Sequence, residues 1–92
     1  MDFLNLKLNS EQKKVYQQER HILEVTEEVA KLMDKKKIDR IELAKRIGKS
    51  PRYITSFLRG TAKMDLRIIS DIFWALDSEF TLVTQKINWE FK

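Results

Sequence analysis

The feature that most constrains the fold is a pair of short helical segments separated by Gly48. Asp39 can cap the first segment, Arg40 to Ile47, because its side-chain oxygen can accept a hydrogen bond from a free N–H of the first turn. Gly48 ends this segment, since glycine adopts the left-handed conformation of a sharp turn at little cost. The apolar residues predicted to point inward are Ile41, Leu43, Ala44 and Ile47.

The second segment starts as sharply as the first one ends. Ser50 can cap it, and Pro51 falls in the first turn, where the missing N–H of proline costs nothing. The segment runs to Arg59 and ends at Gly60. Residues 39–60 therefore predict two short helices joined by a tight turn, which is the helix-turn-helix arrangement.

The second helix has two distinct faces when its residues are placed at ~100° intervals. A buried face is predicted for the apolar residues Pro51, Ile54, Phe57 and Leu58. The opposite face carries Arg52, Ser56 and Arg59, with Tyr53 and Thr55 on its shoulders. Arginine can bond guanine through two donors, and hydroxyl side chains can pair with several base edges. These five residues are therefore predicted to read DNA bases; the alternative is an ordinary solvated surface.

Positive charge is concentrated around this unit. Residues Lys31 to Arg67 hold twelve basic and four acidic side chains, a net charge of +8, whereas the rest of the chain has a net charge of −4. Such polarity is typical of a surface that faces nucleic acid. The cations expected to surround the second helix and contact DNA phosphates are Arg40, Lys45, Lys49, Arg59 and Lys63.

The N-terminal part of the chain predicts one long helix. Residues 10–37 contain apolar residues at helical spacing and no glycine or proline, and Ser10 is a suitable cap. This helix is longer than a small helical core needs, so its first half is expected to pack on something else, such as a second copy of the chain. Before it, Leu4, Leu6 and Leu8 alternate with polar residues, as in a strand or extended arm.

The C-terminal part predicts a fourth helix and a strand. The helix covers residues 65–76 with Asp65 as its cap, and β-branched residues indicate a strand over residues 80–87. All elements belong to one domain, residues 1–92, because chains divide into separate cores only at much greater lengths. The fold class is mainly α.

Residues from about Lys37 to Leu76 resemble the Cro/C1-type, lambda-repressor-like helix-turn-helix family. The matching positions are Leu43-Ala44, Ile47-Gly48, Ser50, Ile54, Thr55, Phe57-Leu58 and Gly60. The resemblance implies a helix-turn-helix bundle, here with an extended N-terminal helix and a C-terminal strand. It also implies a phosphate contact for Arg40, and contacts to the DNA backbone or bases for Ser50, Pro51, Arg52 and Ser56.

Three departures from the family pattern shift these expectations. Arg40 stands where glutamine is usual, which adds charge to the phosphate contact. Pro51 replaces a polar residue, so base reading is expected to move to Arg52, Tyr53 and Ser56. Asp77 replaces the usual glycine after the fourth helix, and aspartate tolerates the left-handed region.

Several apolar residues are expected to lie outside the core. Trp74 falls on the polar side of the fourth helix, which suggests a contact surface, although it could fold back on the first helix. The residues predicted to form a protein interface are Trp74, Phe80, Leu82, Trp89 and Phe91. A strand over residues 80–87 needs a partner edge, either residues 4–8 or the same strand of a second copy. A homodimer is therefore predicted.

Other functions lack the residues they need. The chain has no cysteine and one histidine, His21, with no second ligand near it, so no metal, cofactor or enzymatic activity is expected. It lacks a signal peptide and a run of ~18 apolar residues, which predicts a soluble cytoplasmic protein. The predicted function is a dimeric repressor that binds double-stranded DNA. The alternatives are an antitoxin with a toxin partner, and an adaptor that uses the motif for protein contacts.

Overall fold

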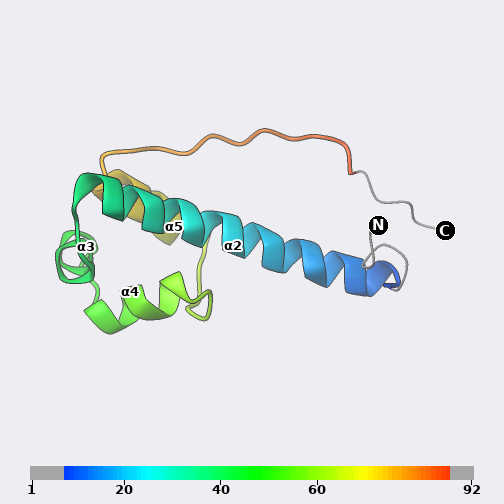
Figure 1. Ribbon diagram of the computed structural model, residues 1–92, viewed down its shortest axis with the longest axis horizontal. Coiled ribbons are helices and arrows are strands. Elements are labelled where there is room, and N and C mark those ends of the chain that lie inside the picture. Colours follow the sequence, from blue (N-terminus) through cyan, green and yellow to red (C-terminus); the bar gives the residue numbers. More distant parts are fainter. Residues whose placement is uncertain (1–7, 88–92) are drawn as a thin grey trace.

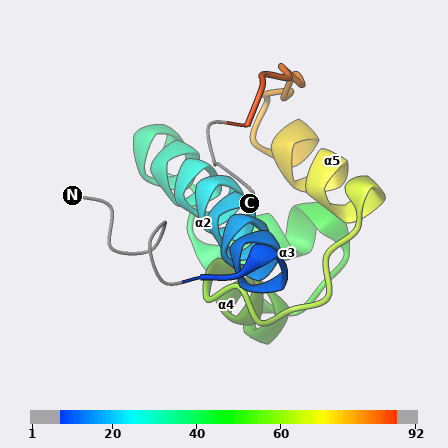
Figure 2. The same cartoon turned by 90° about the vertical axis from the view of Figure 1, so that its right-hand side faces the viewer.

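The computed structural model describes residues 8–87. Regular secondary structure within this range consists of the helices α2 (Ser10–Lys36), α3 (Arg40–Ile47), α4 (Pro51–Leu58) and α5 (Leu66–Ala75). The three short helices gather around the C-terminal half of α2, and the N-terminal half of α2 projects beyond them (Figure 1). In the perpendicular view, α4 and α5 lie on different sides of α2 (Figure 2). The mainly helical fold class is confirmed.

Side-chain caps set where the helices begin. Asp39, Ser50 and Asp65 each accept a hydrogen bond from a backbone N–H of the first turn, as predicted. The predicted cap of α2 is wrong by one residue. Asn9 accepts from the N–H of Gln12 at 2.8 Å, and the Gln12 side chain accepts from the N–H of Asn9 at 3.0 Å. This reciprocal capping box satisfies two backbone donors, whereas Ser10 alone would satisfy one.

The core is built from residues of all four helices. It consists of Val29, Met33, Leu43, Ala44, Ile54, Phe57, Ile72, Phe73 and Leu76. Two residues predicted to point inward do not: Ile41 is 65% exposed, and Pro51 is also exposed. Both lie in the first turns of their helices.

Two glycines end helices in the left-handed conformation. Gly48 follows α3 with φ of 70°, and Gly60 lies two residues after α4 with φ of 78°. At Gly60 there is also a steric reason, because an added Cβ would lie 3.1 Å from Cγ2 of Ile22 on α2. Asp77 has φ of 59° after α5, which agrees with the sequence-based expectation for this position.

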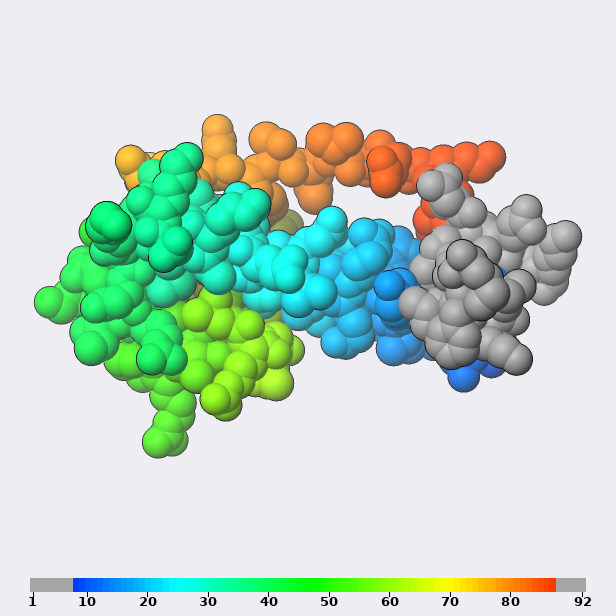
Figure 3. All heavy atoms as spheres, viewed as in Figure 1, coloured from blue at the N-terminus to red at the C-terminus, as the bar shows by residue number. Residues whose placement is uncertain are grey.

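The N-terminal half of α2 has apolar residues that nothing in residues 8–87 buries. Val15 is 46% exposed and Leu23 is 54% exposed. The space-filling view shows this half of the helix standing clear of the helical cluster (Figure 3). No helix within the described range is long and apolar enough to cross a membrane.

The strand predicted over residues 80–87 is not present. Residues 78–87, which we call the tail, form an extended segment without regular secondary structure that runs beside α2 toward its N-terminal end (Figure 1). Leu82 and Val83 are 82% and 84% exposed. A strand requires a hydrogen-bonded partner, and the described part of the chain supplies none to the tail. Most of the other predicted partner, residues 4–8, lies outside the described residues.

Candidate nucleic-acid interface

The helix α4 lies at the surface with one face uncovered. Ile54 and Phe57 are buried, whereas Arg52 and Arg59 are exposed and Thr55 and Ser56 are half-buried. This matches the predicted division into an apolar and a polar face, except that Pro51 is exposed and Tyr53 is half-buried. The short turn at residues 48–50 sets α4 against α3, with the tail on the far side of α2 (Figures 1 and 2).

Arg40 joins this face from the start of α3. Its Nη1 donates a hydrogen bond to Oγ1 of Thr55 at 3.2 Å. The Thr55 hydroxyl in turn donates to the carbonyl of Pro51 at 3.2 Å. The fold therefore brings together a residue predicted to bind phosphate and a residue predicted to read bases, which are fifteen positions apart in the sequence.

Tyr53, predicted to be a base-reading residue, lies differently. Its hydroxyl donates to the carbonyl of Lys63 at 3.0 Å, and its ring centre lies 6.4 Å from that of Phe57. The ammonium group of Lys49 lies 5.4 Å from the ring centre of Tyr53, within the range of a cation–π contact. Burial, and secondarily the carboxylate of Asp65, raise the pKa of Tyr53 above its ordinary value. The side chain thus ties the loop before α5 to α4.

Tyr53→Phe should remove the hydrogen bond to the carbonyl of Lys63 and keep the aromatic ring. We expect the free energy of unfolding to fall by about 0.5–1.5 kcal/mol, the usual net value of one hydrogen bond. The raised pKa means that the folded protein holds the phenol proton more tightly, so wild-type stability should decline as pH rises through about 10. Urea unfolding at pH 7 and at pH 10.5 measures both effects. A decline in the variant as steep as in the wild type would show that Tyr53 is not its source.

Cations surround α4, and most of the acids near them are already engaged. Arg40, Lys45, Lys49, Arg52, Arg59 and Lys63 are all exposed. Asp39 and Asp65 cap helices, and Glu42 pairs with Arg46 at 3.0 Å. Ser50 uses its Oγ to accept from the N–H of Tyr53, which leaves its hydroxyl proton free to donate at the N-terminus of α4. A helix N-terminus with this arrangement is suited to a phosphate group.

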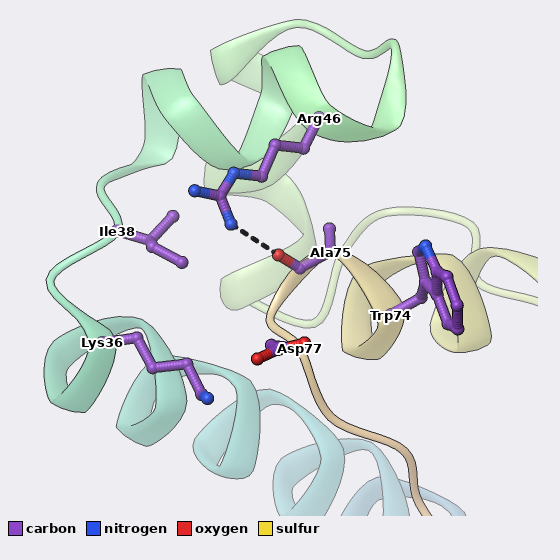
Figure 4. Close-up of a pocket in the computed structure, with 6 residues that line it drawn as sticks. All are labelled: Lys36, Ile38, Arg46, Trp74, Ala75 and Asp77. Atoms are coloured by element: carbon purple, nitrogen blue, oxygen red, sulfur yellow. Dashed lines mark hydrogen bonds between the residues drawn. The ribbon is translucent and has the colours of Figure 1, made fainter.

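Arg46 has a structural role that the sequence reasoning missed. Besides pairing with Glu42, it donates from Nη1 to the carbonyl of Ala75 at 2.8 Å (Figure 4). It therefore fastens α3 to the C-terminal end of α5. The spacing of four residues between Glu42 and Arg46 signals their ion pair. Nothing in the sequence signals the contact with Ala75, because it spans 29 positions.

The predicted interface residues are distributed unevenly. Trp74 is 83% exposed, as expected, and Leu82 on the tail is nearly as exposed. Phe80 instead packs within the chain, with its ring centre 5.4 Å from that of Phe73. Trp89 and Phe91 lie outside the described residues.

Trp74 borders a surface hollow at the end of α5, which we call the Trp74 hollow (Figure 4). Its lining residues are Lys36, Ile38, Arg46, Trp74, Ala75 and Asp77. Across residues 8–87, no group of three histidine or acidic side chains is arranged to hold a metal ion.

Comparison with known proteins agrees with this geometry. Residues 29–81 match the model of a helix-turn-helix family, which covers the second part of α2 and all of α3, α4 and α5. No curated protein and no solved structure matches the chain significantly.

Proposed function

The chain belongs to the Cro/C1-type helix-turn-helix family, and on this basis we propose that it is a dimeric, sequence-specific transcriptional repressor. Family membership supports the DNA-binding role. The observation that carries the proposal is the exposed polar face of α4, with Arg52 and Arg59 on it and exposed cations around it. Nothing in this role requires a catalytic residue, and we propose no enzymatic activity.

The proposed contacts follow from the placement of the side chains. With α4 in the major groove, Arg52 and Arg59 would extend to base edges, with Ser56 between them. Arg40 would act together with Thr55, because the two are hydrogen-bonded. The groups proposed to contact phosphates are Ser50 at the N-terminus of α4 and the surrounding side chains of Arg40, Lys45, Lys49 and Lys63. Tyr53 would position α4 without touching a base.

The proposed dimer uses the tail. A two-fold axis through the centre of residues 80–87, vertical in the view of Figure 1, would pair the two tails antiparallel and keep both α4 helices on the same side. It would also set the two α2 helices antiparallel, so that the N-terminal half of each, with Val15 and Leu23, would lie toward the C-terminal half of the other. Two α4 helices on one side suit two major grooves about one DNA turn, ~34 Å, apart. A repressor of this kind acts by occupying a palindromic operator.

Arg52→Ala and Lys63→Ala should separate base reading from phosphate binding. Once the operator has been selected from random DNA, Arg52→Ala is expected to weaken its binding by about 1–3 kcal/mol and to relax preference at one base pair. Lys63→Ala should weaken operator and random DNA equally and lower the salt slope by about one. Lys63→Ala is a suitable control, because alanine keeps the backbone carbonyl that accepts the hydrogen bond from Tyr53, so the substitution should leave the position of α4 unchanged. Equal losses on both DNAs for Arg52→Ala would contradict the assignment.

A further inference from the structure

The Trp74 hollow is a second surface that the DNA-binding face does not use. It opens where the tail begins, beside Asp77, and Trp74 stands at its edge with 83% of its surface exposed. Half-buried Ile38 and Ala75 contribute apolar area, and Lys36 contributes an ammonium group. A tryptophan this exposed beside an apolar patch with polar neighbours is typical of a protein contact site.

The two walls of the hollow differ in chemistry. Figure 4 shows Trp74 on α5 and Lys36 on α2, with Asp77 between them. An extended segment that passed between these walls would present alternate side chains to each, because successive side chains of extended chain point in opposite directions. The hollow therefore suits a segment in which an aromatic residue is followed directly by an acidic one.

The chain contains such a segment, Trp89-Glu90, just beyond the tail. The ten residues of the tail lead away from the hollow over ~33 Å at about 3.3 Å per residue, so a second copy can deliver this segment more directly than the same copy. A two-fold axis at the centre of residues 80–87 pairs Val83 of one copy with Thr84 of the other. Continued outward, this register places Trp89 opposite Ser78 and Glu90 opposite Asp77.

We propose that the Trp74 hollow receives Trp89 and Glu90 of a second copy, with Trp89 against Trp74 and Glu90 toward Lys36. The proposal rests on the proposed dimer and defines a site that each copy completes in the other. Lys35 and Lys37 flank Lys36 in the sequence and are exposed, which sets three lysines against the nearby carboxylates of Asp34 and Asp77. Arg46 adds N–H donors to the hollow, since its guanidinium has five and the contacts with Glu42 and Ala75 use two.

The fluorescence of Trp74 tests this contact. The chain has two tryptophans, so Trp89→Phe leaves Trp74 as the sole reporter while it retains an aromatic ring at position 89. At concentrations where sedimentation shows a dimer, we expect Trp74 emission at shorter wavelength and protected from acrylamide quenching. Both effects should be lost on dilution to monomer. The reciprocal variant Trp74→Phe should show the same protection for Trp89. It replaces Trp89→Phe as the test protein if Trp89→Phe weakens the dimer.

Charge substitutions identify what covers Trp74. In the Trp89→Phe background, Glu90→Lys should remove the protection of Trp74 in dimers, and the further change Lys36→Glu should restore it. A dimer in which Trp74 is as accessible as in the monomer would overturn the proposed contact and leave the dimer standing. If Trp74 stays protected from quenching in dimers that carry Glu90→Lys, the proposed contact is also overturned, because another surface must then cover Trp74. An intact protein that stays monomeric with operator DNA would overturn the dimer itself, and the contact with it.

Discussion

Ile54→Ala is expected to lower the free energy of unfolding by about 2–5 kcal/mol. Ile54 is fully buried at the centre of the core, where α4 meets the other helices. Truncation to alanine removes apolar contacts and leaves a cavity that the surrounding helices can only partly fill. Since small domains are stable by only about 5–15 kcal/mol, this loss should shift urea unfolding strongly.

The chain offers a matched control for this experiment. Ile41→Ala removes the same atoms from a side chain that is 65% exposed, so it should change stability by about 0.5 kcal/mol or less. DNA binding by the Ile54 variant should recover at temperatures low enough to keep it folded, because Ile54 faces away from the proposed DNA surface. Equal effects of the two substitutions would mean that α4 is rotated relative to the core.

Deletion of the residues after Ser78 should abolish dimerisation and weaken operator binding by ~100- to 10,000-fold, the usual gain from linking two binding sites. The deletion removes all of the tail except Ser78, together with residues 88–92, and with them every contact of the proposed tail pairing. Sedimentation at micromolar concentration measures the oligomeric state, and titration of operator DNA measures the affinity. We expect one α4 per particle to bind a half-site weakly.

A shorter deletion controls for folding. Removing the residues after Thr81 retains Phe80, whose ring packs on Phe73, so the helical core should melt as in the intact protein. This variant should nevertheless be monomeric. An intact protein that is monomeric at micromolar concentration, with and without operator DNA, would contradict the dimer.

The helices could be predicted because local chemistry fixes their ends. Asp39, Ser50 and Asp65 act on the next few residues of their own segments, so the sequence alone reveals them. The error in the predicted cap of α2 also has a local cause. Asn9 and Ser10 are both good caps, and only the reciprocal contact with Gln12 decides between them.

Contacts between distant segments could not be predicted in this way. Helical periodicity placed Tyr53 at the edge of the exposed face, but the loop that carries Lys63 passes close enough to bond its hydroxyl. The same periodicity placed Ile41 inward without information on how far the neighbouring helices extend. For residues 80–87, β-branched side chains indicate a preference for extended backbone, and a preference alone does not supply the partner that a strand requires.

The length of α2 has a consequence for the spacing of the DNA sites. It is one uninterrupted helix of 27 residues, ~40 Å long, without glycine or proline, and its Ile22 lies against Gly60 at the end of α4. In a dimer joined through the tail, with the two α2 helices antiparallel, a stiff rod rather than a flexible linker would set the distance between the two α4 helices. Such a dimer should bind tightly only to operators with one particular spacing between the two half-sites. One extra base pair between the half-sites lengthens the DNA by about 3.4 Å and also rotates it, and a rigid dimer could follow neither change.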